Sequence, residues 1–298
     1  MIAMKTFLTL LFLMVGLMAC SPSEQPVVET PVEKITNTPQ LPTHTQTPFA
    51  PSATPMALVA SVNGDPITRE TYEAELARFR GASEGGLVDF PEEKVLTDLI
   101  DQTLLAQAAA EAGFVITDDI LQERLRQWDI DDQVLDAWMT TYGYSPESFV
   151  ETMRRSIAAA WMRDQIMAEV PGSVEQVHAR QILLYNSEEA ERIYQQLQAG
   201  TEFGTLAEQY DPLTKGDLGW FPRGYLTVPE LDDVVFALRP GEYSPVIQTL
   251  LGYHIIQVLE RDPSRPLSSD AYRVLQIQAV QQWLETRRDQ SEIKIYLP

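Results

Sequence analysis

The sequence contains little cysteine and little basic charge. Cys20 is the only cysteine among 298 residues, so no disulfide can form within the chain, and an oxidising compartment would leave the fold to its hydrophobic core. Lysine and arginine number 22 against 43 acidic residues, which gives a formal net charge of −21. Binding to phosphates requires clustered basic side chains. The acidic balance therefore argues against nucleic acid or an anionic membrane surface as a ligand.

One apolar run stands near the start, and it is too short to be read as a membrane-spanning helix. The run from Phe7 to Met18 follows Lys5 and has the length of a signal-peptide core. It leads into Leu17-Met18-Ala19-Cys20, which resembles a lipobox. We expect residues 1–20 to be a lipoprotein signal peptide and Cys20 to carry the lipid that anchors the protein to a membrane of the cell envelope, outside the cytoplasm. The alternative is an ordinary cleaved signal with a chance cysteine.

Aromatic residues are nearly absent from residues 21–56. Eight prolines are interleaved there with threonine, serine, glutamine and glutamate. Such a segment cannot bury enough apolar surface to offset the entropy lost on ordering. We expect a disordered tether with an average end-to-end distance of about 30 to 40 Å, which holds the folded part away from the membrane.

The rest of the chain is rich enough in apolar residues, at 44% overall, to form about two packed domains. Residues 57–172 begin with an alternating strand pattern and the turn Asn63-Gly64-Asp65-Pro66. Thr68 is the expected N-cap of the first helix. Further helices are predicted over about 95–113, from Thr117, over about 131–142 and after Ser145-Pro146.

The helix after Pro146 carries Met, Trp and Ile at helical spacing, and this stripe has two interpretations. A stripe of this kind usually packs into a core. Methionine-rich surfaces also adapt to many partners, so the stripe could instead form a groove for unfolded chains. The methionines that would contribute are Met139, Met153, Met162 and Met167.

Residues 173–263 show a different pattern, in which short strands and helices alternate after the break at Pro171-Gly172. The pattern predicts a small α+β unit with an antiparallel hairpin near its end. The predicted strands cover 177–184, 246–248 and 253–259, and the predicted helices cover 187–199, 206–210 and 229–238. After Pro263 and Pro266, Ser268 or Ser269 is the expected cap of an amphipathic helix.

Three pieces of this region together resemble a parvulin-type peptidyl-prolyl isomerase domain. They are Val177-His178-Ala179-Arg180-Gln181-Ile182-Leu183, Gly216-Asp217-Leu218-Gly219-Trp220-Phe221 and Thr249-Leu250-Leu251-Gly252-Tyr253-His254-Ile255-Ile256. Each piece alone would be an ordinary strand or turn, and their order and spacing make the resemblance specific. The segment Val62-Asn63-Gly64-Asp65-Pro66-Ile67-Thr68 is similar to the opening of SurA- and PrsA-type extracytoplasmic foldases.

The resemblance implies an α+β architecture with an inserted domain. A helical chaperone-like domain would comprise residues 57–172, with the C-terminal helix of residues 264–298 returning to pack on it. The parvulin-like domain of antiparallel sheet and helices would be inserted at residues 173–263.

The resemblance also assigns the residues of the site. His254 takes the place of the second active-site histidine, and Thr249 takes the place of the threonine that orients the histidine pair. Gln181 stands where the family usually carries the first histidine, and Asp211 is the candidate for the acidic or thiol position. The proline ring would be held by Leu226, Leu231 and Phe236.

The missing first histidine is not replaced by His178. Residues three apart in a strand point to opposite faces, so His178 should face away from the site. Glutamine can both donate and accept hydrogen bonds, and the resemblance therefore implies a site that persists with altered strength at Gln181.

Rotation about a prolyl bond breaks no bond, so the expected catalyst needs neither metal nor cofactor. It must bind the twisted amide better than either planar form. We expect a peptidyl-prolyl isomerase with chaperone activity, whose partners are unfolded or newly translocated proteins with X-Pro bonds. One alternative is a non-catalytic chaperone or scaffold in which the parvulin unit only binds peptides and His254 is a satisfied core histidine. Another is a plain adhesion or assembly lipoprotein.

Overall fold

The structure is a computed structural model that describes residues 57–82 and 91–297. The predicted signal peptide, the tether and Cys20 lie outside the described residues. Among the helices of the described ranges, none has the length and apolar character needed to cross a membrane.

Contacts along the chain define two compact units. The first is Met1–Trp161 together with Ser291–Pro298, and the second is Met162–Gln290. This division differs from the boundary predicted at residues 172 and 173. The reason is that helix α6 (Pro146–Ala168) is continuous across the division and ends only near Pro171-Gly172.

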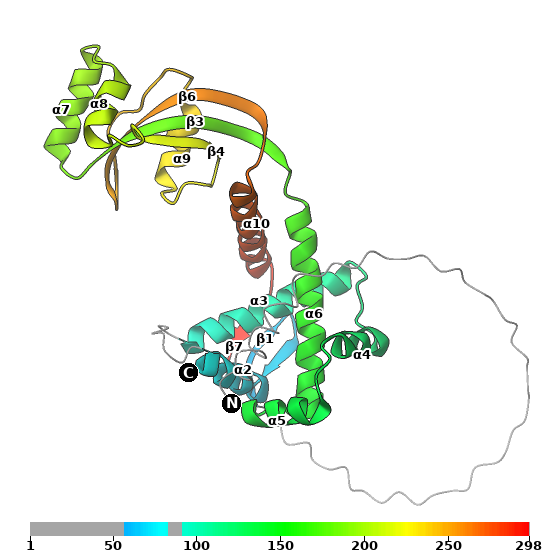
Figure 1. Ribbon diagram of the computed structural model, residues 1–298. Helices are drawn as coiled ribbons and strands as arrows, with labels where there is room; N and C mark the ends of the chain where they lie inside the picture. Colours follow the sequence, from blue (N-terminus) through cyan, green and yellow to red (C-terminus); the bar gives the residue numbers. More distant parts are fainter. Residues whose placement is uncertain (1–56, 83–90, 298) are drawn as a thin grey trace, which may run out of the picture. The chain divides into compact units, whose positions relative to one another are not determined.

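The first unit combines a three-stranded antiparallel sheet with helices (Figure 1). The sheet has the order β2-β1-β7. Its strands are β1 (Leu58–Val62), β2 (Asp65–Thr68) and β7 (Ile293–Ile295), and its helices are α2 (Arg69–Ala82), α3 (Pro91–Glu111), α4 (Asp118–Gln127), α5 (Asp132–Tyr142) and the first part of α6.

Local sequence explains how these elements begin. Asn63 and Gly64 adopt positive φ angles of 52° and 93° in the turn that joins β1 to β2. Thr68 accepts a hydrogen bond from the amide of Thr71 at 3.1 Å, and Thr117 accepts one from Ile120 at 3.4 Å, so both caps are as predicted. The buried faces of β1 and β2 then pack on α2 and α3 in one apolar cluster.

The methionine stripe is mostly core. Met153 is fully buried, and Phe149 and Ile157 are 3% and 4% exposed. These residues pack with Met139 in a cluster that also takes in α2 and α4. The buried members of the stripe therefore have no surface to offer an unfolded chain.

The second unit contains a four-stranded antiparallel sheet of order β4-β3-β6-β5 (Figure 1). Its elements are β3 (Ser173–Leu184), α7 (Ser187–Gln198), α8 (Phe203–Tyr210), β4 (Asp217–Pro222), α9 (Glu230–Ala237), β5 (Ile247–Thr249), β6 (Gly252–Pro266) and α10 (Ser269–Asp289). Helices α7 and α8 pack on one face of the sheet, and α9 packs on the other.

The caps of the second unit follow the sequence. Gly200 has φ of 95°, and the amide of Thr201 donates to the carbonyl of Gln196 at 3.0 Å, so α7 ends in a Schellman motif. Ser268, rather than Ser269, caps α10, because its hydroxyl accepts from the amide of Ala271 at 3.2 Å.

Strands β3 and β6 are both longer than predicted, and they close the sheet at its far end. The pairing runs on to Ser173 and Pro266, past Pro263. Pro263 is accommodated because the register shifts between Val174 and Gln176, which leaves it in a bulge where no amide hydrogen is needed. The carbonyl of Gly172 accepts from the amide of Leu267 at 2.9 Å. The chain therefore enters and leaves the parvulin-like sheet at one place.

Candidate active site

His254 lies on β6 between its neighbours β3 and β5, and its side chain is 2% exposed. Its Nε2 is 2.9 Å from the hydroxyl of Thr249, and its Nδ1 is 3.0 Å from Oε1 of Gln181. The structure thus brings together three of the four residues predicted to be catalytic. Gln181 reaches His254 diagonally, because Gln181 pairs with Ile256, two residues further along β6.

The partners of His254 define where its proton lies. With the carbonyl oxygen of Gln181 facing Nδ1, the imidazole donates from Nδ1, and Nε2 accepts from the hydroxyl of Thr249. The Thr249 oxygen in turn accepts from the amide of Leu251 at 3.1 Å. Burial lowers the pKa of His254. The ring is therefore held neutral and in one orientation.

The loop before β4 makes close backbone contact with Gln181. The amide of Gln181 donates to the carbonyl of Gly216 at 2.8 Å. Gly216 has φ of 72°, and a Cβ at this position would lie 1.9 Å from the carbonyl oxygen of Gln181. Only glycine permits both the backbone angle and the approach. The sequence shows a glycine turn here, but nothing in its pattern reveals the contact with β3.

The three residues predicted to hold the proline ring share one apolar cluster. Leu231 and Phe236 on α9 are 3% and 8% exposed, and Leu226 packs against them from the preceding loop. Ile256 belongs to the same cluster, and strand alternation places His254 on the same face as Ile256. The apolar cluster and the His254 group therefore lie on one side of the sheet.

Asp211 has a different environment from the other predicted residues. Its carboxylate accepts from the amides of Leu213 and Thr214 at 3.1 Å each and from the amide of Gly216 at 3.3 Å. It also accepts from the Thr214 hydroxyl, and these bonds lower its pKa, the hydroxyl first. Within the described ranges the hydrogen bonds of its carboxylate all stay in this loop. Asp211 shapes the turn that carries Gly216, and a catalytic role for it stays a prediction.

His178 lies on the opposite face, as the alternation predicts. Its Nε2 is 2.8 Å from Asp217, and its ring stacks on Trp220 with centroids 5.6 Å apart. Its neighbour two residues on, Arg180, lies over Phe203 of α8. His178 therefore belongs to the α7 and α8 side of the sheet and makes no contribution at His254.

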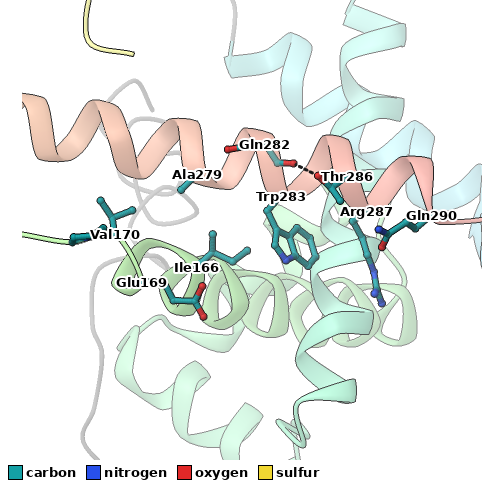
Figure 2. A pocket seen from close by; sticks show the side chains of 10 residues that line it. Ile166, Glu169, Val170, Ala279, Gln282, Trp283, Thr286, Arg287 and Gln290 are labelled. Atoms are coloured by element: carbon teal, nitrogen blue, oxygen red, sulfur yellow. Dashed lines mark hydrogen bonds between the residues drawn. The ribbon is translucent and has the colours of Figure 1, made fainter. Parts of the chain in front are cut away.

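A separate cavity of about 490 Å³ lies in the second unit between the end of α6 and α10. Figure 2 shows Trp283 reaching from α10 toward the end of α6, where Ile166 lies. Val170 and Ala279 add apolar surface, and Glu169 and Arg287 supply one charge of each sign. None of the predicted catalytic residues lines this cavity.

The chemistry available at His254 is binding and orientation. A neutral imidazole is fixed between two hydrogen-bonding side chains beside an apolar cluster of the kind that holds a ring. In the ranges that the structure describes, no group of histidine, cysteine and carboxylate side chains could hold a metal ion. Such a site suits a reaction that bends an amide out of plane without breaking a bond.

Comparison with known families agrees with this geometry. The PPIC-type PPIase domain, also called rotamase, matches residues 171–260, and the SurA-like N-terminal domain matches residues 44–163. The chain therefore carries a parvulin-type peptidyl-prolyl isomerase domain joined to a SurA-like domain. The predicted α+β architecture and the predicted enzyme class are both confirmed.

Among curated relatives, the foldase protein PrsA of Caldanaerobacter subterraneus subsp. tengcongensis is 31% identical over 67% of this chain and 72% of its own length. The chain belongs to the PrsA foldase family. PrsA of Halalkalibacterium halodurans is 28% identical over 61% of this chain and 63% of its own length. The chaperone SurA of Nitrosospira multiformis is 35% identical over 42% of this chain, but this covers only 33% of SurA.

Proposed function

We propose that the protein is a lipid-anchored foldase of the cell envelope that isomerises X-Pro bonds in newly translocated proteins. The observation that carries this proposal is the arrangement of His254 between Gln181 and Thr249, on the face of the sheet that holds Leu226, Leu231 and Phe236. The envelope location is supported by the names of the relatives, PrsA and SurA.

The site would act by favouring the twisted amide. The barrier to rotation is about 18 to 20 kcal/mol because planarity is held by resonance. The apolar cluster would hold the pyrrolidine ring, while the oriented imidazole and hydroxyl would stabilise the out-of-plane amide. Gln181 keeps His254 in place, but it supplies an amide where the family has an imidazole. We therefore propose an active site of reduced strength.

The test is a protease-coupled isomerisation assay with the full chain in detergent and a tetrapeptide that contains one X-Pro bond. We expect acceleration over the uncatalysed rate, and we expect His254→Ala to remove most of it. His178→Ala is the matched control, since His178 lies on the other face of the same sheet. A wild-type rate equal to background would contradict the isomerase proposal.

A second function, non-catalytic peptide binding, is favoured by two observations. Gln181 replaces an imidazole, and His254 is only 2% exposed. In that case the tetrapeptide would bind to the wild-type chain without any acceleration, and His254→Ala would change affinity alone. The two functions are thus separated by measuring the rate and the affinity on the same samples.

We further propose that unfolded chains bind to the part of the protein made of residues 57–172 and 267–298. The cavity beside Trp283 supports this assignment, because it combines an aromatic side chain with aliphatic walls. The Gly172–Leu267 hydrogen bond allows residues 173–266 to be deleted and the ends joined. The deletion variant should still suppress aggregation of a denatured client. Loss of that activity on deletion would instead assign client binding to the parvulin domain.

A further inference from the structure

Gly224 is held by hydrogen bonds to both of its backbone polar groups, at a place outside the His254 group. Its amide donates to Oδ2 of Asp232 on α9 at 2.5 Å. Its carbonyl accepts from Nε2 of Gln278 on α10. The loop that contains Gly224 also carries Leu226, two residues further on, and Leu226 belongs to the apolar cluster predicted to hold the proline ring.

The position of the Asp232 side chain is unfavourable for the stability of the fold. Its side chain is buried, with the residue 8% exposed, and Oδ1 has no hydrogen-bond partner among the described residues. Burial raises the pKa of this carboxyl. A buried carboxylate with one unpaired oxygen destabilises a fold. Its retention beside the apolar cluster points to a use other than stability.

The backbone of the loop is shaped for this contact. Gly224 has φ of 83°, and a Cβ there would lie 2.6 Å from Oε1 of Gln278. The amide of Tyr225 donates to the carbonyl of Pro222 at 3.3 Å, so the chain turns at Gly224 before it reaches Leu226. The left-handed angle requires glycine, and a Cβ at this position would also force the end of the Gln278 side chain to shift. The position of Leu226 therefore depends on the two side chains that hold Gly224.

We propose that Asp232 and Gln278 are positioning residues of the isomerase site. By fixing Gly224 they hold Leu226 against Leu231 and Phe236, and so they define the wall of the proline pocket. Helix α10 is then a working part of the site, although it lies outside the residues 171–260 that match the isomerase family. This inference rests on the proposed prolyl-binding function of the same pocket.

A positioning role predicts a specific kinetic signature. The pocket wall contacts the proline ring in the planar and the twisted amide alike, so its loosening should raise KM and leave kcat nearly unchanged. For Asp232→Ala and Gln278→Ala in the full chain, we expect KM for the tetrapeptide to rise roughly three- to tenfold, taking one lost buried hydrogen bond as the guide. Glu230→Ala and Gln281→Ala, exposed neighbours on the same helices, should leave KM unchanged.

Two further variants separate positioning from general destabilisation. Asp232→Asn retains an oxygen that can accept from Gly224, so it should keep KM close to the wild-type value. Because both side chains hold the same residue, Gly224, the double variant Asp232→Ala with Gln278→Ala should raise KM no further than the worse single variant. Multiplying effects would mean that the two side chains act separately and would overturn the proposal.

A readout independent of catalysis completes the test. The methyl resonances of Leu226 and the hydrogen exchange of the Gly224 amide should change in both alanine variants and remain unchanged in both controls. If the wild-type chain gives no acceleration, the isomerase proposal fails, and the dissociation constant of the same tetrapeptide replaces KM as the measure. Unchanged affinity together with unchanged Leu226 resonances in folded variants would overturn the positioning role, whatever the outcome for catalysis.

Discussion

Replacing Gln181 by histidine should strengthen the isomerase. In the structure the Gln181 amide oxygen accepts a hydrogen bond from His254 at 3.0 Å, on the diagonal between β3 and β6. A histidine at this position would present an imidazole to the same ring from the same strand. His254 would keep a partner on Nδ1, and its Nε2 would keep the Thr249 hydroxyl at 2.9 Å.

The size of the rate increase follows from the imidazole that Gln181 does not supply. An oriented polar partner that strengthens in the transition state is worth about 1 to 3 kcal/mol when buried, which corresponds to roughly ten- to a hundredfold in rate. We therefore expect Gln181→His to raise kcat by that factor with little change in peptide affinity. The apolar cluster is untouched by the substitution, so KM should stay near the wild-type value.

Two companion variants make the result specific. Gln181→Leu leaves Nδ1 of a 2% exposed His254 without its partner, and we expect it to lower both kcat and the melting temperature. Leu231→Ala should instead raise KM. The measurements are protease-coupled kinetics and thermal unfolding of the same preparations. If Gln181→His gives no acceleration in a folded protein that still binds the tetrapeptide, then His254 is not part of a catalytic pair.

Three further outcomes are expected. Because burial lowers the pKa of His254, the unfolded chain binds this proton more readily than the folded chain. The contribution of His254 to stability should therefore be constant above about pH 6.5 and be lost as the pH drops below it. His254→Gln should remove that part of the pH dependence in urea titrations. Gly216→Ala should lower the free energy of unfolding by about 3 kcal/mol or more, because the added Cβ would meet the Gln181 carbonyl. Gly219 has φ of 68° but open space around it, so Gly219→Ala should lower the same free energy by only about 1 kcal/mol. Cys20→Ser should release the protein from membrane pellets, and unchanged fractionation would argue against the lipid anchor.

Side-chain periodicity allowed part of the site to be predicted. Strand alternation separates His178 from Gln181, and the structure places the two side chains on opposite faces. The resemblance to parvulins, rather than periodicity, assigns Leu231 and Phe236 to the proline pocket, and the structure buries both in one cluster. The separation of His178 from Gln181 depends only on the period of a strand, which is visible in the sequence.

Other parts depend on contacts between distant segments, and these have no local signal. The hydrogen bond between Gln278 and Gly224 joins residues 54 positions apart, and nothing in the sequence around either residue indicates it. The bulge at Pro263 depends on a register shift between Val174 and Gln176, so the strand predicted over 253–259 in fact continues past the proline. Asp211 matches a family position by order in the sequence, yet the hydrogen bonds of its carboxylate stay within its own loop.

Strand β7 pairs with β1, so the sheet of the first unit stays incomplete until residues 293–295 are available for pairing. The hydroxyl oxygens of Ser61 and Tyr296 lie 3.3 Å apart, although the two residues are 235 positions apart in the sequence. A chain synthesised at about 5 to 20 residues per second would leave this edge of β1 open for roughly 10 to 50 s. An open edge invites pairing with other chains. The interval is comparable to that of an uncatalysed prolyl isomerisation, so a protein that assists slow folding would itself pass through a slow and exposed stage.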